Sequence, residues 1–383
     1  MSITPAFAAV LGLASSDPQV QADAFSGAVD SPPALMWERD LPGPPLAASS
    51  HTELGSPLMH ENQVLLGSAG SNALYALDRR HGTLVHRYAS NGPVQAAPVV
   101  AGDSVIFTDA AGYTWSYRLG AEEPTWKHYG GAPILSEPTI VDDVVYVANV
   151  GNAVYALGLS DGQIQWRHKQ ERDFTRAGQL ELYGAPAPTV HDDLLLVGFH
   201  NGAVVGLDKS TGAREWQRQV GEGRYPDIIG SPVVVGADAL VAAFTSPLMS
   251  LNLETQSVRW RVDAGGSDAP VLQNETVFFG GSDGTLHSLD VLTGAPNWEW
   301  EAPEGGSLTA PVPTPSGLLV GSSNSGLFLV DEETGETRWA FDPGYTVAGV
   351  SAEIAVNGRQ IVVVTNAGRV LSLIVPEASS NER

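Results

Sequence analysis

The sequence contains no cysteine, and this absence excludes disulfides, thiolate metal ligands, a cysteine nucleophile and lipid attached to cysteine. Lysine is also scarce and occurs only at Lys127, Lys169 and Lys209. Because 43 acidic residues outnumber 20 basic ones, the formal net charge is −23. Such a charge repels phosphate backbones and anionic lipid head groups, which argues against nucleic-acid binding. No apolar run approaches the roughly 20 residues of a membrane-spanning helix.

Motifs of catalysis and metal binding are also missing from the sequence. The nine histidines are scattered, and neither HExxH, GxSxG nor a P-loop occurs. Two carboxylate pairs, Asp142/Asp143 and Asp192/Asp193, occupy the same position in two repeated units. That position has the composition of a hairpin turn, so we assign the pairs to turn formation. We therefore expect no catalytic site, no bound metal and no cofactor.

The two ends of the chain lack the periodicity of folded elements. Residues 1–32 are rich in Ala, Ser, Pro and Gly, and residues 377–383 are polar. The first segment reads either as a flexible leader or as the remnant of an export signal. Ala6-Phe7-Ala8 fits a small-x-small cleavage pattern, but no basic residue precedes it. The stretch Leu13-Ala14-Ser15-Ser16 resembles a lipobox, but it ends in Ser16 where a lipoprotein would need cysteine, which leaves membrane anchoring open.

The rest of the sequence is one unit repeated. A tryptophan follows a turn glycine by four residues at Gly162/Trp166, Gly212/Trp216, Gly294/Trp298 and Gly335/Trp339. Trp126 and Trp260 occupy the same position without the glycine, and His86 occupies it after Gly82. Successive spacings from Trp126 to Trp339 are 40, 50, 44, 38 and 41 residues. This period is typical of a four-stranded propeller blade, and the regular tryptophans predict packing between blades.

Each unit alternates short β-branched or aromatic runs with turns rich in Asp, Asn and Gly, the pattern of antiparallel hairpins. Eight units begin near residues 56, 96, 136, 184, 230, 268, 308 and 350. The eighth shows only three strands, at residues 352–356, 360–365 and 369–374. We predict that residues 34–39 supply its fourth strand and close the ring. The expected fold is all-β: residues 33–376 form a single eight-bladed propeller of four-stranded antiparallel blades, with little helix.

The repeat, of the form YAL(D)xxTGxxxW, resembles the PQQ-type propeller repeat. Eight such blades in a chain of this size resemble the BamB family of outer-membrane protein assembly factors. The resemblance implies a non-enzymatic scaffold that docks on the POTRA domains of a BamA-like partner. It further implies a periplasmic location at the inner face of the outer membrane, and a protein that is monomeric outside its complex.

The family carries a Leu-x-Leu-Arg-Gly motif before its fourth blade and an Asp-x-Asp motif in the next loop. Here the corresponding residues are Leu180, Leu182, Tyr183, Asp227 and Ile229. By resemblance these five form the partner-binding site, although tyrosine replaces the arginine and isoleucine replaces the second aspartate. The departures indicate either a divergent cognate partner or a different one. In an extended segment both leucines face the same side, either toward a partner or under their own loop.

Two other functions use the same fold. A sensor or adhesion propeller would bind a peptide or glycan, and an aromatic and charged cluster in the central funnel would favour it. A PQQ-dependent dehydrogenase commonly stacks a vicinal cysteine pair on its cofactor, and this sequence has no cysteine. A scaffold would be favoured by an apolar patch on one rim.

Overall fold

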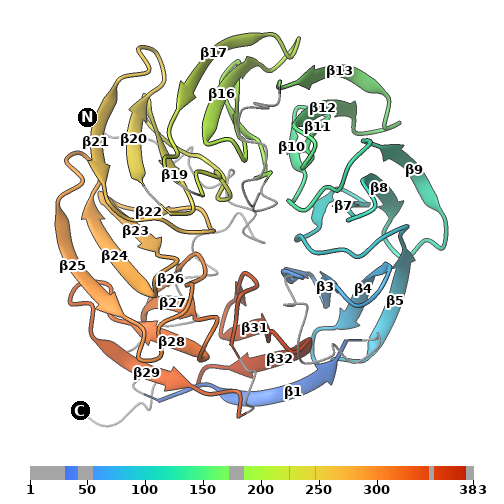
Figure 1. Cartoon of the computed structure of the whole chain (residues 1–383). Helices are drawn as coiled ribbons and strands as arrows, with labels where there is room; N and C mark the ends of the chain where they lie inside the picture. The colour runs from blue at the N-terminus through green and yellow to red at the C-terminus, as the bar shows by residue number, and fades with distance from the viewer. Residues whose placement is uncertain are drawn as a thin grey trace, which may run out of the picture.

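The computed structural model describes residues 31–41, 55–171, 185–223, 225–245, 247–344 and 349–376. These residues form eight four-stranded antiparallel sheets arranged around a central axis, an eight-bladed β-propeller (Figure 1). The predicted fold class is therefore confirmed. Blades are numbered along the chain, from blade 1 (β2 to β5) to blade 8 (β30 to β32 with β1). No helix fit to cross a membrane occurs among the described residues.

The first two strands of every blade lie nearest the axis. The innermost strands are β2 (Leu58–His60), β6 (Val99–Ala101), β10 (Thr139–Val141), β14 (Thr189–His191), β18 (Val233–Val235), β22 (Val271–Gln273), β26 (Val312–Thr314) and β30 (Ala355–Asn357). The second strands are β3 (Gln63–Gly67), β7 (Ser104–Thr108), β11 (Val144–Ala148), β15 (Leu194–Gly198), β19 (Asp238–Ala242), β23 (Thr276–Gly280), β27 (Gly317–Gly321) and β31 (Gln360–Val364).

The remaining two strands build the outer part of each blade. The third strands are β4 (Ala73–Asp78), β8 (Tyr113–Arg118), β12 (Ala153–Gly158), β16 (Ala203–Asp208), β20 (Leu248–Asn252), β24 (Thr285–Asp290), β28 (Leu327–Val330) and β32 (Arg369–Ile374). The outer strands are β5 (Leu84–Ala89), β9 (Pro124–Tyr129), β13 (Ile164–Lys169), β17 (Arg214–Gln219), β21 (Val258–Val262), β25 (Pro296–Glu301), β29 (Thr337–Phe341) and β1 (Ala34–Asp40).

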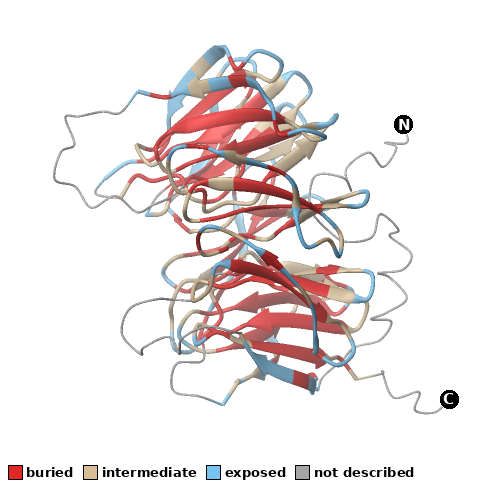
Figure 2. Ribbon diagram, turned by 90° about the vertical axis from the view of Figure 1, so that its right-hand side faces the viewer, coloured by how far each residue is buried: buried red, intermediate tan, exposed pale blue. Residues whose placement is uncertain are grey.

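The core lies between neighbouring blades, because the second and third strands are buried on both faces (Figure 2). Side chains alternate along a strand, so each blade serves two interfaces. On β3, Val64 and Leu66 pack with Val362 of blade 8, whereas Leu65 packs with Val105 of blade 2. The ring is thus held by a continuous series of interfaces, each made of the same kinds of apolar residue.

Tryptophans on five of the outer strands fasten one blade to the next, as the sequence predicts. Trp126 donates its Nε1–H to the carbonyl of Leu159 at 2.8 Å. Its ring lies on Gly162, where an added Cβ would come within 2.5 Å of ring atom Cε3. The same contact recurs at Trp37/Gly82, Trp166/Gly212, Trp260/Gly294 and Trp298/Gly335. Glycine is required there both for space and for a positive φ, +65° at Gly162.

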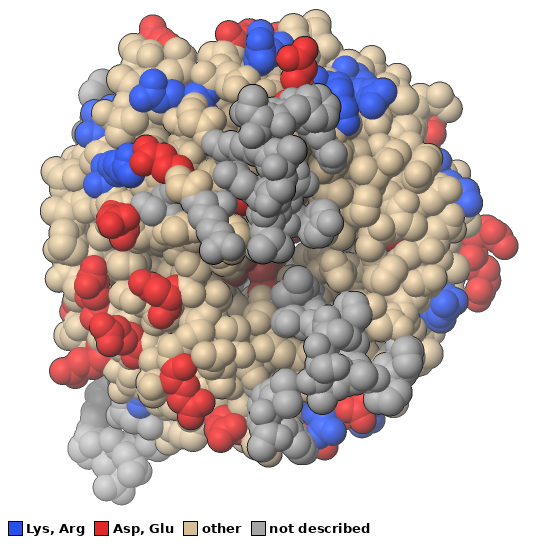
Figure 3. Space-filling model, viewed as in Figure 1, with Lys and Arg blue, Asp and Glu red and all other residues tan. Residues whose placement is uncertain are grey.

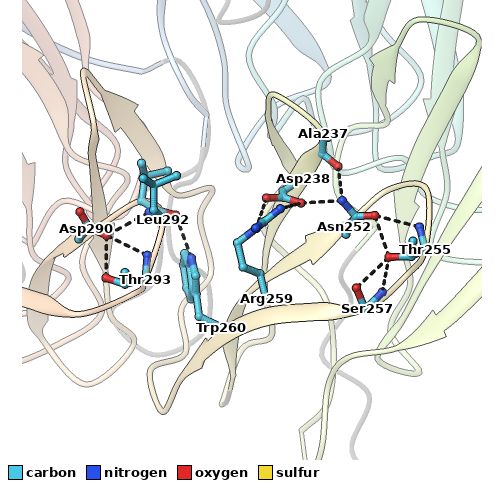
Figure 4. Close-up of polar contacts among 11 residues, drawn as sticks. Ala237, Asp238, Asn252, Thr255, Ser257, Arg259, Trp260, Asp290, Leu292 and Thr293 are labelled. Carbon is cyan, nitrogen blue, oxygen red and sulfur yellow. Dashed lines mark hydrogen bonds and ion pairs between the residues drawn. The ribbon is translucent and has the colours of Figure 1, made fainter.

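In several blades an aspartate shapes the turn that receives the tryptophan. Figure 4 shows Trp260 of β21 beside the turn that follows Asp290 in blade 6. The Asp290 carboxylate accepts hydrogen bonds from the Thr293 amide at 2.8 Å and its hydroxyl at 2.6 Å. These hydrogen bonds lower the pKa of the Asp290 carboxyl group, and the bond from the Thr293 hydroxyl has the largest effect. The repeated Asp-x-x-Thr-Gly sequence therefore builds a preformed seat for the indole.

The N-terminal strand closes the ring as predicted. Strand β1 pairs antiparallel with β32 and becomes the outer strand of blade 8. Trp37 on β1 then donates to the carbonyl of Arg79 in blade 1 at 2.9 Å. Arg79 in turn donates from Nε to Gln360 of blade 8 at 2.6 Å. The first and last blades are therefore joined by chain pairing, an indole latch and a guanidinium contact.

One strand differs from the expectation. The first strand of blade 8, expected at residues 352–356, is β30 and begins only at Ala355. Ahead of it, Ala352 and Ile354 are buried, and the Glu353 amide donates to Ser56 Oγ of blade 1 at 3.3 Å. The residues before β30 therefore serve the contact with blade 1 and not the ladder with β31.

Candidate docking face

Three of the five predicted partner-binding residues lie outside the described residues. Leu180, Leu182 and Tyr183 belong to residues 172–184, in the connection from blade 3 into blade 4. Their role remains a prediction. The described ends of this connection are nonetheless informative, because Gln170 is buried and donates from Nε2 to Gln217 on β17 at 2.9 Å. The start of the connection, where it leaves blade 3, is therefore hydrogen-bonded to the outer strand of blade 4.

The other two predicted residues lie in the connection from blade 4 into blade 5. Asp227 is only 1% exposed, and its carbonyl accepts a hydrogen bond from the Phe244 amide at 2.9 Å. Ile228 is fully buried and joins the core between blades 4 and 5. Ile229 is half-buried, as is Tyr225. The loop therefore offers Ile229 and Tyr225 to solvent, while Asp227 and Ile228 face the protein.

The two connections meet at a single glycine. A Cβ on Gly198 at the end of β15 would overlap with Cγ2 of Ile228 and lie 3.0 Å from Cγ of Pro186. Pro186 lies two residues after Gly184, the last residue of the predicted leucine motif. In addition, the hydroxyl of Thr189 donates to the carbonyl of Pro232 at 2.7 Å. The structure therefore brings the described ends of both predicted segments together on one face.

An ion pair secures the second connection from the side of blade 5. Arg261 on β21 donates to both carboxylate oxygens of Glu222 at 2.9 and 3.1 Å. The hydrogen bonds from Arg261 lower the pKa of Glu222. On the other side, Gln219 Nε2 donates to the carbonyls of Asn201 and Gly221. The loop is thus held at its base, and sequence reasoning did not identify these anchoring residues.

The central channel is acidic. Glu137, Asp268 and Glu353 lie just before the innermost strands of blades 3, 6 and 8, and acidic side chains are visible in the central hollow (Figure 3). Burial, followed by the charges of Glu137 and Asp268, raises the pKa of Glu353 to about 8. Burial also raises the pKa of Asp268 to about 6, against a hydrogen bond from the Ala310 amide. Glu353 is exposed to solvent, but protein surrounds its carboxyl group, which is therefore poorly hydrated.

The channel composition bears on the alternatives. The residues two positions before the eight innermost strands are Ser56, Ala97, Glu137, Ala187, Ser231, Ala269, Ala310 and Glu353. An aromatic platform for a glycan or peptide is absent from these positions. Within the described ranges, no group of three or more His, Asp or Glu side chains is placed to hold a metal ion.

Exposed apolar side chains occur on the rim of blades 8 and 1. Leu35 and Met36 on β1 are 51% and 40% exposed, and Leu84 and Val85 on β5 are 56% and 51% exposed. These residues occupy equivalent positions at the start of two neighbouring outer strands. Their exposure could not be predicted from the sequence, because it depends on which face of an outer strand is free.

The family relationship is visible in the sequence. Residues 27–120 and 121–300 match the family model of the outer membrane protein assembly factor BamB. The BamB of Legionella pneumophila is 30% identical over 206 residues, which are 52% of this chain and 53% of that protein. The matched region spans about half to two thirds of the length of the first such relatives.

Solved structures agree on the fold. The crystal structure of BamB from Moraxella catarrhalis superposes with a TM-score of 0.73 at 16% identity, covering 89% of this chain and 99% of that one. A quinohemoprotein alcohol dehydrogenase from Pseudomonas putida gives 0.69 at 13% identity, covering 95% and 80%. At sequence identities this low, the similarity to these structures shows a shared fold alone. The family match, in contrast, covers more than half of the sequence, and the chain belongs to the family of the outer membrane protein assembly factor BamB.

Proposed function

We propose that this protein is a non-enzymatic scaffold of outer-membrane protein assembly that works in the periplasm at the inner face of the outer membrane. It docks on the POTRA domains of a BamA-like partner and supports insertion of barrel proteins. The observation that carries the proposal is the family match, which spans the connections into blades 4 and 5. The proposed contact residues are Leu180, Leu182, Tyr183 and Ile229, and the proposed task of Asp227 is to position their loop.

The proposal assigns different tasks to the residues of the second connection. Ile228 seats the loop against Gly198, and Glu222 holds its base through Arg261. Asp227, being buried, positions the loop and does not form the contact surface. Ile229 adds apolar area to the docking face. A loop held in place loses little conformational entropy on binding, which favours affinity.

The scaffold role is favoured over an enzymatic one by the relatives. The matching family is described as an assembly factor, whereas the alcohol dehydrogenase shares the fold alone at 13% identity. The chain also lacks the cysteine pair common in such dehydrogenases. We assign no cofactor to the protein.

A binding titration tests the proposal. The POTRA fragment of the BamA homologue from the same organism is titrated against the full chain, with circular dichroism to verify folding. We expect binding by the wild type and a loss of at least about tenfold in Ile229→Asp, since an apolar contact becomes a buried charge. Leu180→Asp/Leu182→Asp is expected to bind as weakly.

The matched control is Leu84→Asp, which places the same charge on an exposed apolar residue of blade 1. It should bind like the wild type. If Leu84→Asp weakens binding as much as Ile229→Asp, the docking face is wrongly assigned. If the folded wild type does not bind at all, the proposed partner is wrong.

A further inference from the structure

Basic residues are concentrated on three neighbouring outer strands. Strands β13, β17 and β21 together carry six of the 20 basic residues in the chain and one acidic residue, Glu215. We call the basic side chains the basic rim: Arg167, Lys169, Arg214, Arg218, Arg259 and Arg261. In Figure 3 blue side chains gather along the upper edge, where Figure 1 shows these strands. The rim therefore differs in sign from the protein as a whole.

The acidic residues are concentrated elsewhere. Residues 263–344, which form blades 6 and 7, contain thirteen Asp and Glu and a single basic residue, Arg338. Red side chains accordingly gather over the lower left of Figure 3, near β25 and β29. The net charge of −23 thus describes an asymmetric molecule. Beyond a Debye length of about 8 Å at physiological salt, a partner near the basic rim is screened from the acidic blades.

Part of the basic rim is neutralised within the protein. Arg259 forms a two-pronged contact with Asp238 at 2.5 and 3.1 Å (Figure 4), and Arg261 does the same with Glu222. Arg214 donates to the neutral Gln217 at 3.1 Å, and Arg167 lies 5.4 Å from the centre of the Tyr155 ring. These neutral contacts leave the positive charges uncompensated.

Arg218 adds a third such charge. It is exposed, and no ion pair joins it, Arg214 or Arg167 to a carboxylate of the described residues. Strand β17, which holds two of the three, is exposed at every position except the half-buried Trp216. The middle of the basic rim therefore presents positive charge on its most accessible strand.

Protection of the sheet edge does not explain the excess of positive charge on these strands. Charged side chains on an outer strand deter pairing with other chains, and either sign serves that purpose. Strand β25 uses Glu299 and Glu301 in the same setting. An excess of six basic residues over one acidic residue across three consecutive strands is selected by something besides edge protection, and charge complementarity to a partner accounts for it.

We propose that the basic rim of β13, β17 and β21 receives an acidic protein surface of the docking partner. The inference rests on the proposed function, because β13 and β17 lead directly into the two connections of the docking face. The rim would steer encounter, while the apolar loop residues hold the complex. A bilayer is disfavoured because its extended anionic surface would also face the acidic blades, whereas a protein patch acts locally.

Charge reversal with a matched control tests the inference. The variant Arg214→Glu/Arg218→Glu changes two rim residues, and Arg87→Glu/Arg118→Glu makes the same change in charge at exposed residues of blades 1 and 2. Association rates with the POTRA fragment are measured from about 0.05 to about 0.5 M NaCl. We expect the rim variant to associate about tenfold more slowly at low salt and like the wild type at high salt. The control should follow the wild type throughout.

A second probe separates this inference from the proposed function. A fluorescein-labelled oligoglutamate peptide carries the acidic chemistry alone, and phosphatidylglycerol vesicles carry a lipid surface. Binding of the peptide that is lost only in the rim variant supports the basic rim, even if the POTRA fragment does not bind. The inference is overturned if both double variants behave alike, if no salt dependence is found, or if the vesicles bind and the peptide does not.

Discussion

The contact of Trp126 with Gly162 and the Leu159 carbonyl, here called the tryptophan latch, predicts a loss of stability whose size follows from the geometry. Gly162→Ala places a Cβ 2.5 Å from the Trp126 ring and forces alanine to a φ of +65°. The backbone strain costs about 1 kcal/mol. Displacing the indole adds an overpacking cost of about 1–3 kcal/mol, part of which is the hydrogen bond to Leu159. We expect a total loss of about 2–4 kcal/mol in the free energy of unfolding.

Gly102→Ala is the matched control for this substitution. Gly102 has a similar φ of +57°, and nothing lies within 4 Å of an added Cβ. Its loss should be the backbone strain alone, about 1 kcal/mol. Urea unfolding followed by tryptophan fluorescence and circular dichroism measures both variants. On a Trp126→His background, which copies the His86 of blade 1, the two glycine substitutions should become equal. Equal losses in the wild-type background would refute the latch.

Three further predictions concern the channel, a buried carboxylate and the closure. Because the pKa of Glu353 is raised from 4.5 to about 8, the protonated carboxyl group favours folding, and the stability of the wild type should fall as the pH rises from about 4.5 to about 8. Urea midpoints measured across this range should decline in the wild type and decline less in Glu353→Gln. Asp109→Ala removes the acceptor for the Gly92 amide and the Trp115 indole, and should cost at least about 3 kcal/mol in urea unfolding. Trp37→Ala should lower the free energy of unfolding by about 3–5 kcal/mol, and a loss below 1 kcal/mol would deny β1 its role in closure.

Most of the fold follows from local chemistry that recurs. The Asp-x-x-Thr-Gly turn and the tryptophan four residues after its glycine recur once per blade, so both the repeat and its strands can be recognised in the sequence. The closing strand is predictable because β1 carries the Trp37 that the eighth unit lacks. The boundary of β30 is not predictable, since Glu353 bonds to Ser56 almost three hundred residues away.

The candidate site is harder to predict from the sequence than the fold. In the sequence Asp227, Ile228 and Ile229 are three adjacent residues, and which of them is buried depends on the space beside Gly198 in another blade. The basic rim is likewise dispersed in the sequence, because its arginines come from strands about fifty residues apart. Aligning the repeats on their tryptophans would reveal part of it, since Arg167 and Arg261 then occupy the same position, one residue after the tryptophan.

The most direct test of the docking face is backbone amide hydrogen exchange of the full chain with and without the POTRA fragment. The account predicts added protection at residues 185–188 and 225–230 and along β17, with β1 and β5 unchanged. Protection confined to the β1 and β5 rim, to the channel segments before the innermost strands, or to none of the chain would contradict it.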